Sequence, residues 1–82
     1  MRSNNHLSLS GVVTKIEPDP ERSGVKFYLV HNFGGGNPPL FLPCVLKRAN
    51  CSIENGETLR IDGHLRAVNG KPTAFVTKAF SV

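Results

Sequence analysis

Residues that interrupt helices and strands divide this chain into short segments. Residues 17–24 and 34–39 are rich in proline and glycine, and Asn-Gly pairs stand at residues 55–56 and 69–70. Proline and glycine interrupt helices and strands, and an Asn-Gly pair is the strongest short signal for a hairpin turn. No segment between these breaks carries the apolar period of a helix. The sequence therefore predicts an all-β protein.

Alternation of apolar and polar side chains predicts five strands and the face that each one buries. The alternation is cleanest in residues 57–67, where Leu59 and Ile61 fall on one face and Arg60 and Arg66 on the other. Five strands without a long helix in 82 residues favour a small closed or half-closed barrel. The predicted strands span residues 5–17, 25–33, 40–48, 57–67 and 72–82.

The first strand is expected to bend. Leu7 and Leu9 alternate with serines, but the alternation loses its phase after Gly11. An internal glycine often marks a bend or bulge in a strand, so we expect one at Gly11. The turn that follows, residues 17–24, holds three of the six acidic residues, and we expect the surface away from this corner to be the more basic part.

The strand over residues 40–48 has one apolar face and one mixed face. Its even positions up to residue 46 are all apolar, whereas its odd positions include Phe41, Pro43 and Lys47. One face can join the core while the other presents a ring and a positive charge. Because proline cannot donate a ladder hydrogen bond, Pro43 predicts an edge or a bulge in this strand.

Composition points to one small, soluble, cytoplasmic domain. Ten basic residues against six acidic ones give a net charge of +4, which is compatible with a polyanionic partner. The spacing of Cys44 and Cys51 fits no metal motif, and both are expected to be reduced thiols. Residues 1–6 are polar, residues 1–4 are expected to be flexible, and no stretch resembles a signal peptide or a membrane span.

Motifs for catalysis, metals and cofactors do not occur. The chain has no Gly-x-Ser-x-Gly, no Cys-x-x-Cys and no paired carboxylates in an apolar context. His6, His31 and His64 stand on separate elements, and residues 34–36 lack the Gly-Lys-Ser/Thr ending of a phosphate loop. We predict neither an enzyme nor a bound metal or cofactor.

Outward rings and cations favour a nucleic-acid-binding face. Single strands are held by aromatic rings that stack on bases and by cations that follow the phosphates. The same rings could instead face a protein partner, and nothing in the sequence separates DNA from RNA. The two outward rings are Tyr28 and Phe41. The candidate cations are Lys26, Lys47, Arg48, Arg60, Arg66 and Lys71, with Lys15 and Lys78 as possible extensions of the path.

Taken together and in order, these motifs resemble the bacterial single-stranded DNA-binding protein family. Residues 5–15 are similar to its opening Asn-x-Val-x-Leu-x-Gly-x-Leu-Thr-x, and residues 23–29 to its Ser-Gly followed by a Phe-x-Leu strand. Residues 41–47 resemble its third strand, and residues 56–65 its Gly-x-x-Leu-x-Val-x-Gly-x-Leu. The resemblance implies an OB-fold, a five-stranded Greek-key barrel with little or no helix, that binds single-stranded DNA with little sequence preference.

The resemblance also assigns roles to residues. It makes Phe41 a stacking residue and Lys47 a base-contacting one, and it maps the glycine bends of two strands to Gly11 and Gly63. The short connector before residue 57, the tight hairpin at residues 69–70 and the end of the sequence at Val82 are similar to short, tail-less primosomal or mobile-element relatives. Such relatives imply work in replication, recombination or repair, as homodimers or homotetramers.

Overall fold

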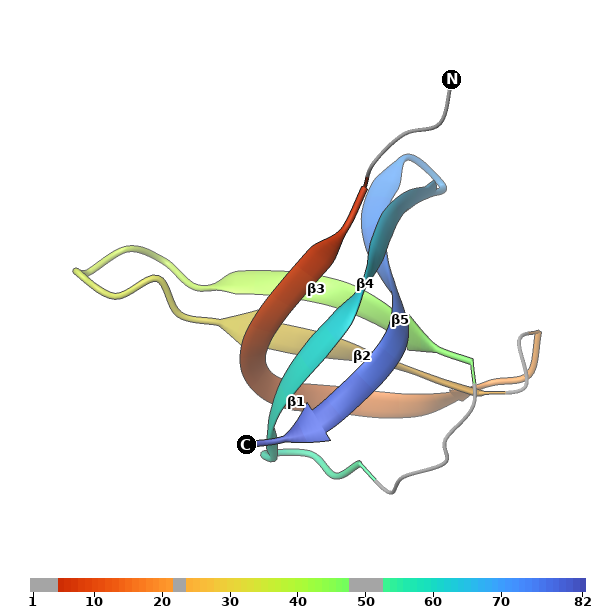
Figure 1. Ribbon diagram of the computed structural model, residues 1–82, viewed down its shortest axis with the longest axis horizontal. Coiled ribbons are helices and arrows are strands. Elements are labelled where there is room, and N and C mark those ends of the chain that lie inside the picture. The colour runs from red at the N-terminus through yellow and green to blue at the C-terminus, as the bar shows by residue number, and fades with distance from the viewer. Residues whose placement is uncertain (1–4, 22–23, 48–52) are drawn as a thin grey trace.

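The computed structural model describes residues 5–21, 24–47 and 53–82, and its strands form a closed barrel (Figure 1). The order around the barrel is β1-β2-β3-β5-β4, and the described residues contain no helix. This is the five-stranded all-β barrel of an OB-fold, as predicted. The expectations for residues 1–4, Arg48 and Cys51 fall outside the described ranges. The strands are β1 (Leu7–Asp19), β2 (Gly24–His31), β3 (Leu40–Leu46), β4 (Thr58–Val68) and β5 (Lys71–Ser81).

Strand β1 bends so that it serves two sides of the barrel (Figure 1). Its first half, through Val12, pairs with β4, and its second half, from Val12 to Asp19, pairs with β2. Gly11 stands directly before this change of partner. The predicted bend at Gly11 is therefore confirmed.

The change of phase in β1 lies four residues later than the sequence suggested. Val13 is fully buried, so the inward row that starts at Leu7 continues past Gly11. The register with β2 breaks between Thr14 and Glu17, where Lys15 has a φ of 56°. The expected loss of phase after Gly11 was wrong, because the extra residue of the bulge is Lys15.

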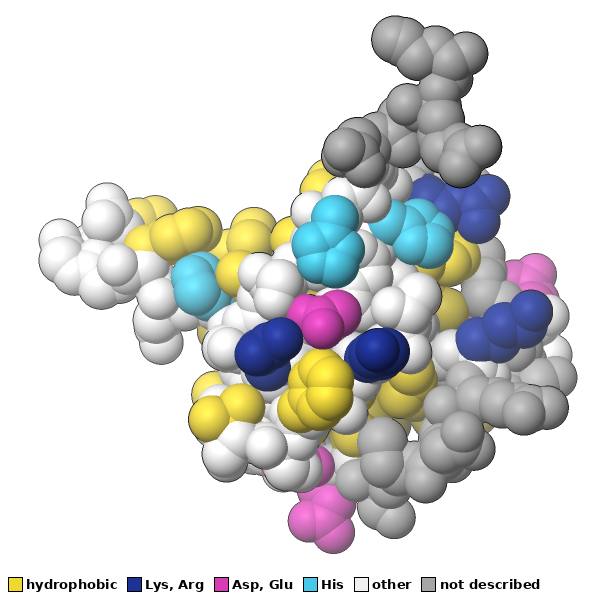
Figure 2. All heavy atoms as spheres, in the orientation of Figure 1, with side chains coloured by type: hydrophobic (Ala, Val, Ile, Leu, Met, Phe, Trp, Pro, Cys, Tyr) yellow, Lys and Arg dark blue, Asp and Glu magenta, His cyan; other side chains and the backbone are white. Residues whose placement is uncertain are grey.

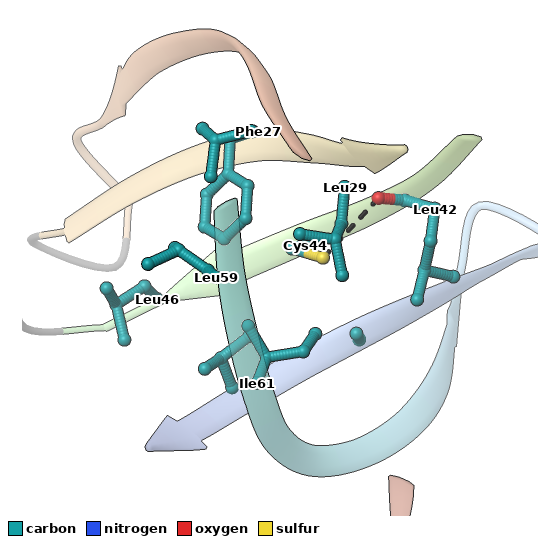
Figure 3. Packing of buried hydrophobic residues seen from close by; sticks show 10 residues of the cluster. Phe27, Leu29, Leu42, Cys44, Leu46, Leu59 and Ile61 are labelled. Atoms are coloured by element: carbon teal, nitrogen blue, oxygen red, sulfur yellow. Dashed lines mark hydrogen bonds between the residues drawn. The ribbon is translucent and has the colours of Figure 1, made fainter. Parts of the chain in front are cut away.

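The buried rows of all five strands meet inside the barrel (Figure 3). The even positions of β3 point inward as predicted, except that Leu40 at its start is 38% exposed. Leu40 pairs with His31 at the end of β2 and lies outside the pairing with β5, so none of the described strands pairs with it on that side. The core comprises Val13, Phe27, Leu29, Leu42, Cys44, Leu46, Leu59, Ile61, Ala74 and Val76.

Cys44 is a free thiol in this core. Its Sγ donates to the carbonyl of Leu42 at 3.4 Å. Burial raises the pKa of Cys44 to about 12, an effect larger than the opposing one of a backbone hydrogen bond from Leu29. Because thiolates are the reactive and metal-binding form, Cys44 serves packing.

Pro43 lies on an edge of β3 and not in a bulge. The pairing of β2 with β3 runs without a register shift from Val25–Leu46 to His31–Leu40. Strand β5 joins β3 in parallel only at Cys44–Leu46. Pro43 stands just before this pairing, where β3 has a strand partner on one side only, and such a position accepts a residue without an N–H.

Two features of the β4–β5 pair, its turn and a shift in its register, depend on glycines. Asn69 and Gly70 have φ values of 52° and 79°, the left-handed pair that a type I′ turn between β4 and β5 requires. The register of β4 with β5 shifts between Asp62 and Gly63. A Cβ at Gly63 would stand 2.2 Å from the carbonyl oxygen of Phe75, so the strands can approach here only at a glycine.

The loop between β2 and β3 projects away from the barrel (Figure 1). Its turn is closed by hydrogen bonds from Asn37 to the Gly34 carbonyl, 3.1 Å from the backbone nitrogen and 2.9 Å from the side-chain amide. Phe33 at its base is 60% exposed. The hairpin-type loop predicted for residues 34–39 is confirmed.

Replacement of Gly63 tests the close approach of β4 and β5. We expect Gly63→Ala to lower the free energy of unfolding by about 3 kcal/mol or more, because backbone and not a flexible side chain blocks the added Cβ. Gly35→Ala is the control: its Cβ meets no backbone, and its positive φ alone costs about 1–2 kcal/mol. Urea unfolding measures both; a Gly63→Ala protein no less stable than Gly35→Ala contradicts the assignment.

Candidate nucleic-acid interface

A groove of about 350 Å³, here called the first groove, crosses the outer face of β2 and β3. The end of β1 forms one rim, and the β4–β5 hairpin forms another. Its lining includes the outward residues of the β2–β3 pair, Lys26, Tyr28, Pro43 and Val45, together with Lys15, Glu17, Asp19, Glu21, Val68, Asn69 and Thr73.

The two predicted stacking rings lie on this outer face. Tyr28 is 40% exposed and Phe41 is 56% exposed. Tyr28 is paired with Pro43 across the strands, and Phe41 with Val30, so the two aromatic residues are diagonal neighbours about 7–8 Å apart at their Cα atoms. Tyr28 lines the first groove, whereas Phe41 stands beyond it, toward the β2–β3 loop. The structure thus brings the two rings together on one face.

Acidic side chains share the first groove with these groups. The Lys26 ammonium lies 3.3 Å from the Glu17 carboxylate, and Asp19 and Glu21 also line the groove. Asp19 is buried and already interacts with another group of the protein. The acidic corner predicted at residues 17–24 thus lies next to Lys26 and Tyr28, because the end of β1 forms a rim of the groove.

Lys15 lines the first groove itself, whereas the sequence suggested it only as a possible extension of the basic path. The bulge gives it a left-handed backbone conformation that costs a non-glycine residue about 1–2 kcal/mol. Bulges often re-aim side chains next to functional sites, and Lys15 lines the first groove. Its only trace in the sequence is the uneven spacing of the inward residues Val13 and Ile16.

A second groove, of about 330 Å³, lies on the outer face of β3, β5 and β4. The predicted cations Lys47 and Arg66 are here, not beside Tyr28. Phe75 and His64, which the site prediction missed, also line it, with Val45, Val76 and Thr77. Alternation along β5 could have predicted an outward Phe75. It lies between Thr73 and Thr77, on the opposite side of the strand from the inward residues Ala74 and Val76.

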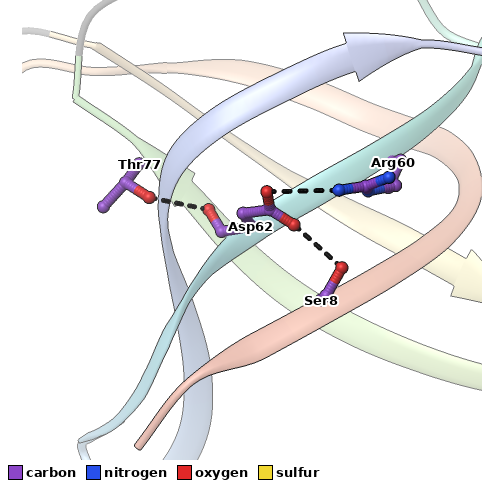
Figure 4. Close-up of polar contacts among 4 residues, drawn as sticks. All are labelled: Ser8, Arg60, Asp62 and Thr77. Carbon is purple, nitrogen blue, oxygen red and sulfur yellow. Dashed lines mark hydrogen bonds and ion pairs between the residues drawn. The ribbon is translucent and has the colours of Figure 1, made fainter.

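Arg60 lies on another face of the barrel. Its neighbours across the strands are Ser10 of β1 and Phe80 of β5, and it lines neither groove. Its guanidinium lies 3.5 Å from Asp62 (Figure 4). It also lies 5.3 Å from the centre of the Phe80 ring. Arg60 does not lie beside Tyr28, because its strand β4 pairs with β5 and β1 and not with β2, which carries Tyr28, or with β3.

On this other face one carboxylate lies between two cations. Lys78 is the cross-strand neighbour of Asp62, so Asp62 has a cation on its own strand and another on β5. On the face that Figure 2 shows, an acidic side chain stands between two basic ones. Of the remaining predicted residues, Lys71 is exposed at the start of β5 beside Val68, at the rim of the first groove.

Asp62 is held in its charged form. The Ser8 hydroxyl donates to its Oδ1 at 2.8 Å (Figure 4). This hydrogen bond, followed by the charge of Arg60, lowers the pKa of Asp62 from its usual 3.8. Asp62 therefore stays ionised at neutral pH, and its backbone carbonyl accepts a further bond from Thr77 at 3.0 Å.

The described residues hold neither a set of metal ligands nor a membrane-spanning helix. No three His, Cys, Asp or Glu side chains among residues 5–21, 24–47 and 53–82 could hold a metal ion together. The same residues contain no helix with the length and apolar character needed to cross a membrane.

Solved structures resemble the whole barrel, although no protein-family model and no curated protein sequence matches the chain. The N-terminal domain of PriB from Thermoanaerobacter tencongensis, described as dimeric, has 20% identity and a TM-score of 0.68 over 98% of both chains. A small single-stranded DNA binding protein from Mycoplasma pneumoniae has 18% identity and a TM-score of 0.69, over 96% of this chain and 94% of its own. PriB from Ralstonia solanacearum has 13% identity and a TM-score of 0.71, over 96% and 98%.

The pKa of Asp62 makes part of the stability depend on pH. A carboxyl whose pKa is lower in the folded than in the unfolded state stabilises the fold above its unfolded pKa, and the effect disappears as the pH falls through the folded pKa. We expect Asp62→Asn to be less stable than the wild type at pH 7, with the deficit vanishing below pH 3.8. Urea midpoints between pH 7 and pH 2 measure it.

Ser8→Ala is the companion variant, because it removes the largest cause of the shift while it keeps the carboxylate. Its deficit should shrink over the same acidic range. A deficit that stays constant from pH 7 to pH 2 in both variants would contradict the assignment.

Proposed function

We propose that residues 1–82 act as one OB domain that binds single-stranded DNA with little sequence preference, as a binding module and not as an enzyme. The observation that carries this proposal is the pair of exposed rings, Tyr28 and Phe41, side by side on the outer face of β2 and β3. A base stacked on a ring contributes about 1–3 kcal/mol and needs no particular sequence, because every base has a flat face.

Cations around the rings suit the phosphates of the same strand. Lys15 and Lys26 line the first groove next to Tyr28, and Lys71 stands at its rim. Lys47 and Arg66 continue the basic path into the second groove, and we include Arg48, which follows Lys47 in sequence. Such contacts release counterions from the nucleic acid, so affinity falls with salt.

The compared structures support this reading of the barrel. One neighbour is described as a small single-stranded DNA binding protein, and two are PriB proteins. We therefore propose a role in replication, recombination or repair. The description of one PriB domain as dimeric supports a homodimer or homotetramer here as well. The cytoplasm, where reduced thiols such as Cys44 persist, is the proposed compartment.

Tyrosine emission tests the proposal directly. Tyr28 is the only tyrosine and the chain has no tryptophan, so the signal reports on the first groove alone. We expect oligo-dT to quench it, with a binding constant that falls steeply as salt rises. No quenching and no salt-dependent binding at low ionic strength would refute the proposal, and tighter binding of oligo-U would shift it to RNA.

Two substitutions of Lys15 separate binding from stability. Lys15→Gly and Lys15→Gln should weaken oligo-dT binding equally and lower the slope of log affinity against log salt by about 0.7, the value for one phosphate contact on a single strand. Only Lys15→Gly removes the left-handed strain, so it should be the more stable of the two by up to about 1 kcal/mol. Unequal binding, or a less stable glycine variant, would contradict the role given to Lys15.

A further inference from the structure

We propose that the second groove is a second stacking and phosphate site for the same nucleic-acid strand, with Phe75 as its ring. This inference rests on the proposed function and adds a site that the two rings of β2 and β3 do not include. Three features of the groove carry it: the packing of Phe75, the charge of the lining and the continuity with the first groove.

Phe75 packs against a second ring and a guanidinium, which are groups that also bind bases and phosphates. The ring of His64 lies nearly parallel to it, at 15° and 5.9 Å between centres, and the Arg66 guanidinium lies 4.9 Å from its centre. Both neighbours come from β4, while Val45 is the partner of Phe75 on β3, the other side. A base that packs on Phe75 would extend a planar stack that His64 already begins.

The charge of the second groove favours a polyanion more than that of the first. Among the residues that the structure describes, its lining holds Lys47 and Arg66, with His64 as a further donor, and no carboxylate. The first groove offers two lysines against three carboxylates, one of them paired with Lys26. Phosphates flanking a base on Phe75 therefore meet cations without an acidic competitor, which makes the second groove the stronger phosphate site.

The two grooves form one path. Val45 lines both, and it is the neighbour of Lys26 on β2 and of Phe75 on β5. From Tyr28 on β2 to Phe75 on β5 the path crosses β3, which makes two interstrand spacings, and shifts by two residues along the strands. These steps give a Cα distance of about 12 Å. One strand of the length that an OB domain usually binds, roughly 4–16 nucleotides, can occupy both sites.

Phe75→Leu tests the site with labelled oligo-dT of about 16 nucleotides, the upper site size of an OB domain. We expect affinity, measured by fluorescence anisotropy, to fall roughly 5- to 150-fold, the range for loss of one stacking ring. Quenching of Tyr28 at saturation should remain, because the first groove is intact. Phe80→Leu is the matched control: it is also an outward ring of β5 with an arginine over it, but it lines neither groove, and its affinity should equal that of the wild type.

A charge pair gives an independent test that leaves the ring in place. The double variant Lys47→Gln/Arg66→Gln should lower the salt slope by about 1.4, two phosphate contacts on a single strand. The double variant Arg60→Gln/Lys78→Gln, on the face around Asp62 that lines neither groove, should leave the salt slope unchanged. This pair decides the question even if Phe75→Leu does not fold.

The outcomes distinguish the two proposals. Wild-type binding with Tyr28 quenching, but with Phe75→Leu equal to Phe80→Leu and equal salt slopes in the two double variants, refutes the second groove and leaves the proposed function standing. A wild-type protein that does not bind oligo-dT refutes both.

Discussion

A parallel pairing of three residues closes this barrel, and the arrangement of its outer surface depends on it. Cys44, Val45 and Leu46 of β3 lie beside Ala74, Phe75 and Val76 of β5. Cys44, Leu46, Ala74 and Val76 point into the core, so apolar burial holds the pairing together from inside. The residues between them, Val45 and Phe75, then face outward side by side and become the point where the two grooves meet. Before Cys44 the strands have separated, which leaves Pro43 on an edge.

Local signals in the sequence predicted the parts of the fold that depend on neighbouring residues. The Asn69–Gly70 turn follows from residues that tolerate left-handed backbone, and the inward rows of β2 and β4 follow from alternation alone. The outward positions of Tyr28 and Phe41 come from the same alternation. These features need no knowledge of which strands are partners.

Features that depend on strand order were missed. Arg60 alternates outward as clearly as Lys26, yet strand order puts it beside Phe80 on another face. The acidic corner at residues 17–21 lines the groove only because the β1–β2 hairpin folds along it. Val45 alternates outward but is only 7% exposed, between its cross-strand neighbours Lys26 of β2 and Phe75 of β5. Alternation reports which side of a strand a residue is on, and not what the sheet places above it.

The ion pair between Lys26 and Glu17 gives the first groove a built-in competitor. A carboxylate at 3.3 Å already occupies the ammonium that a phosphate would approach, so a strand entering the groove exchanges one anion for another. The exchange releases less free energy than contact with an unpaired lysine, and the carboxylate is at hand to recapture the ammonium when the phosphate moves. Under the proposed function, a strand in the first groove would therefore be held more by the rings of Tyr28 and Phe41 than by Lys26, and its backbone would be free to slip past this ion pair.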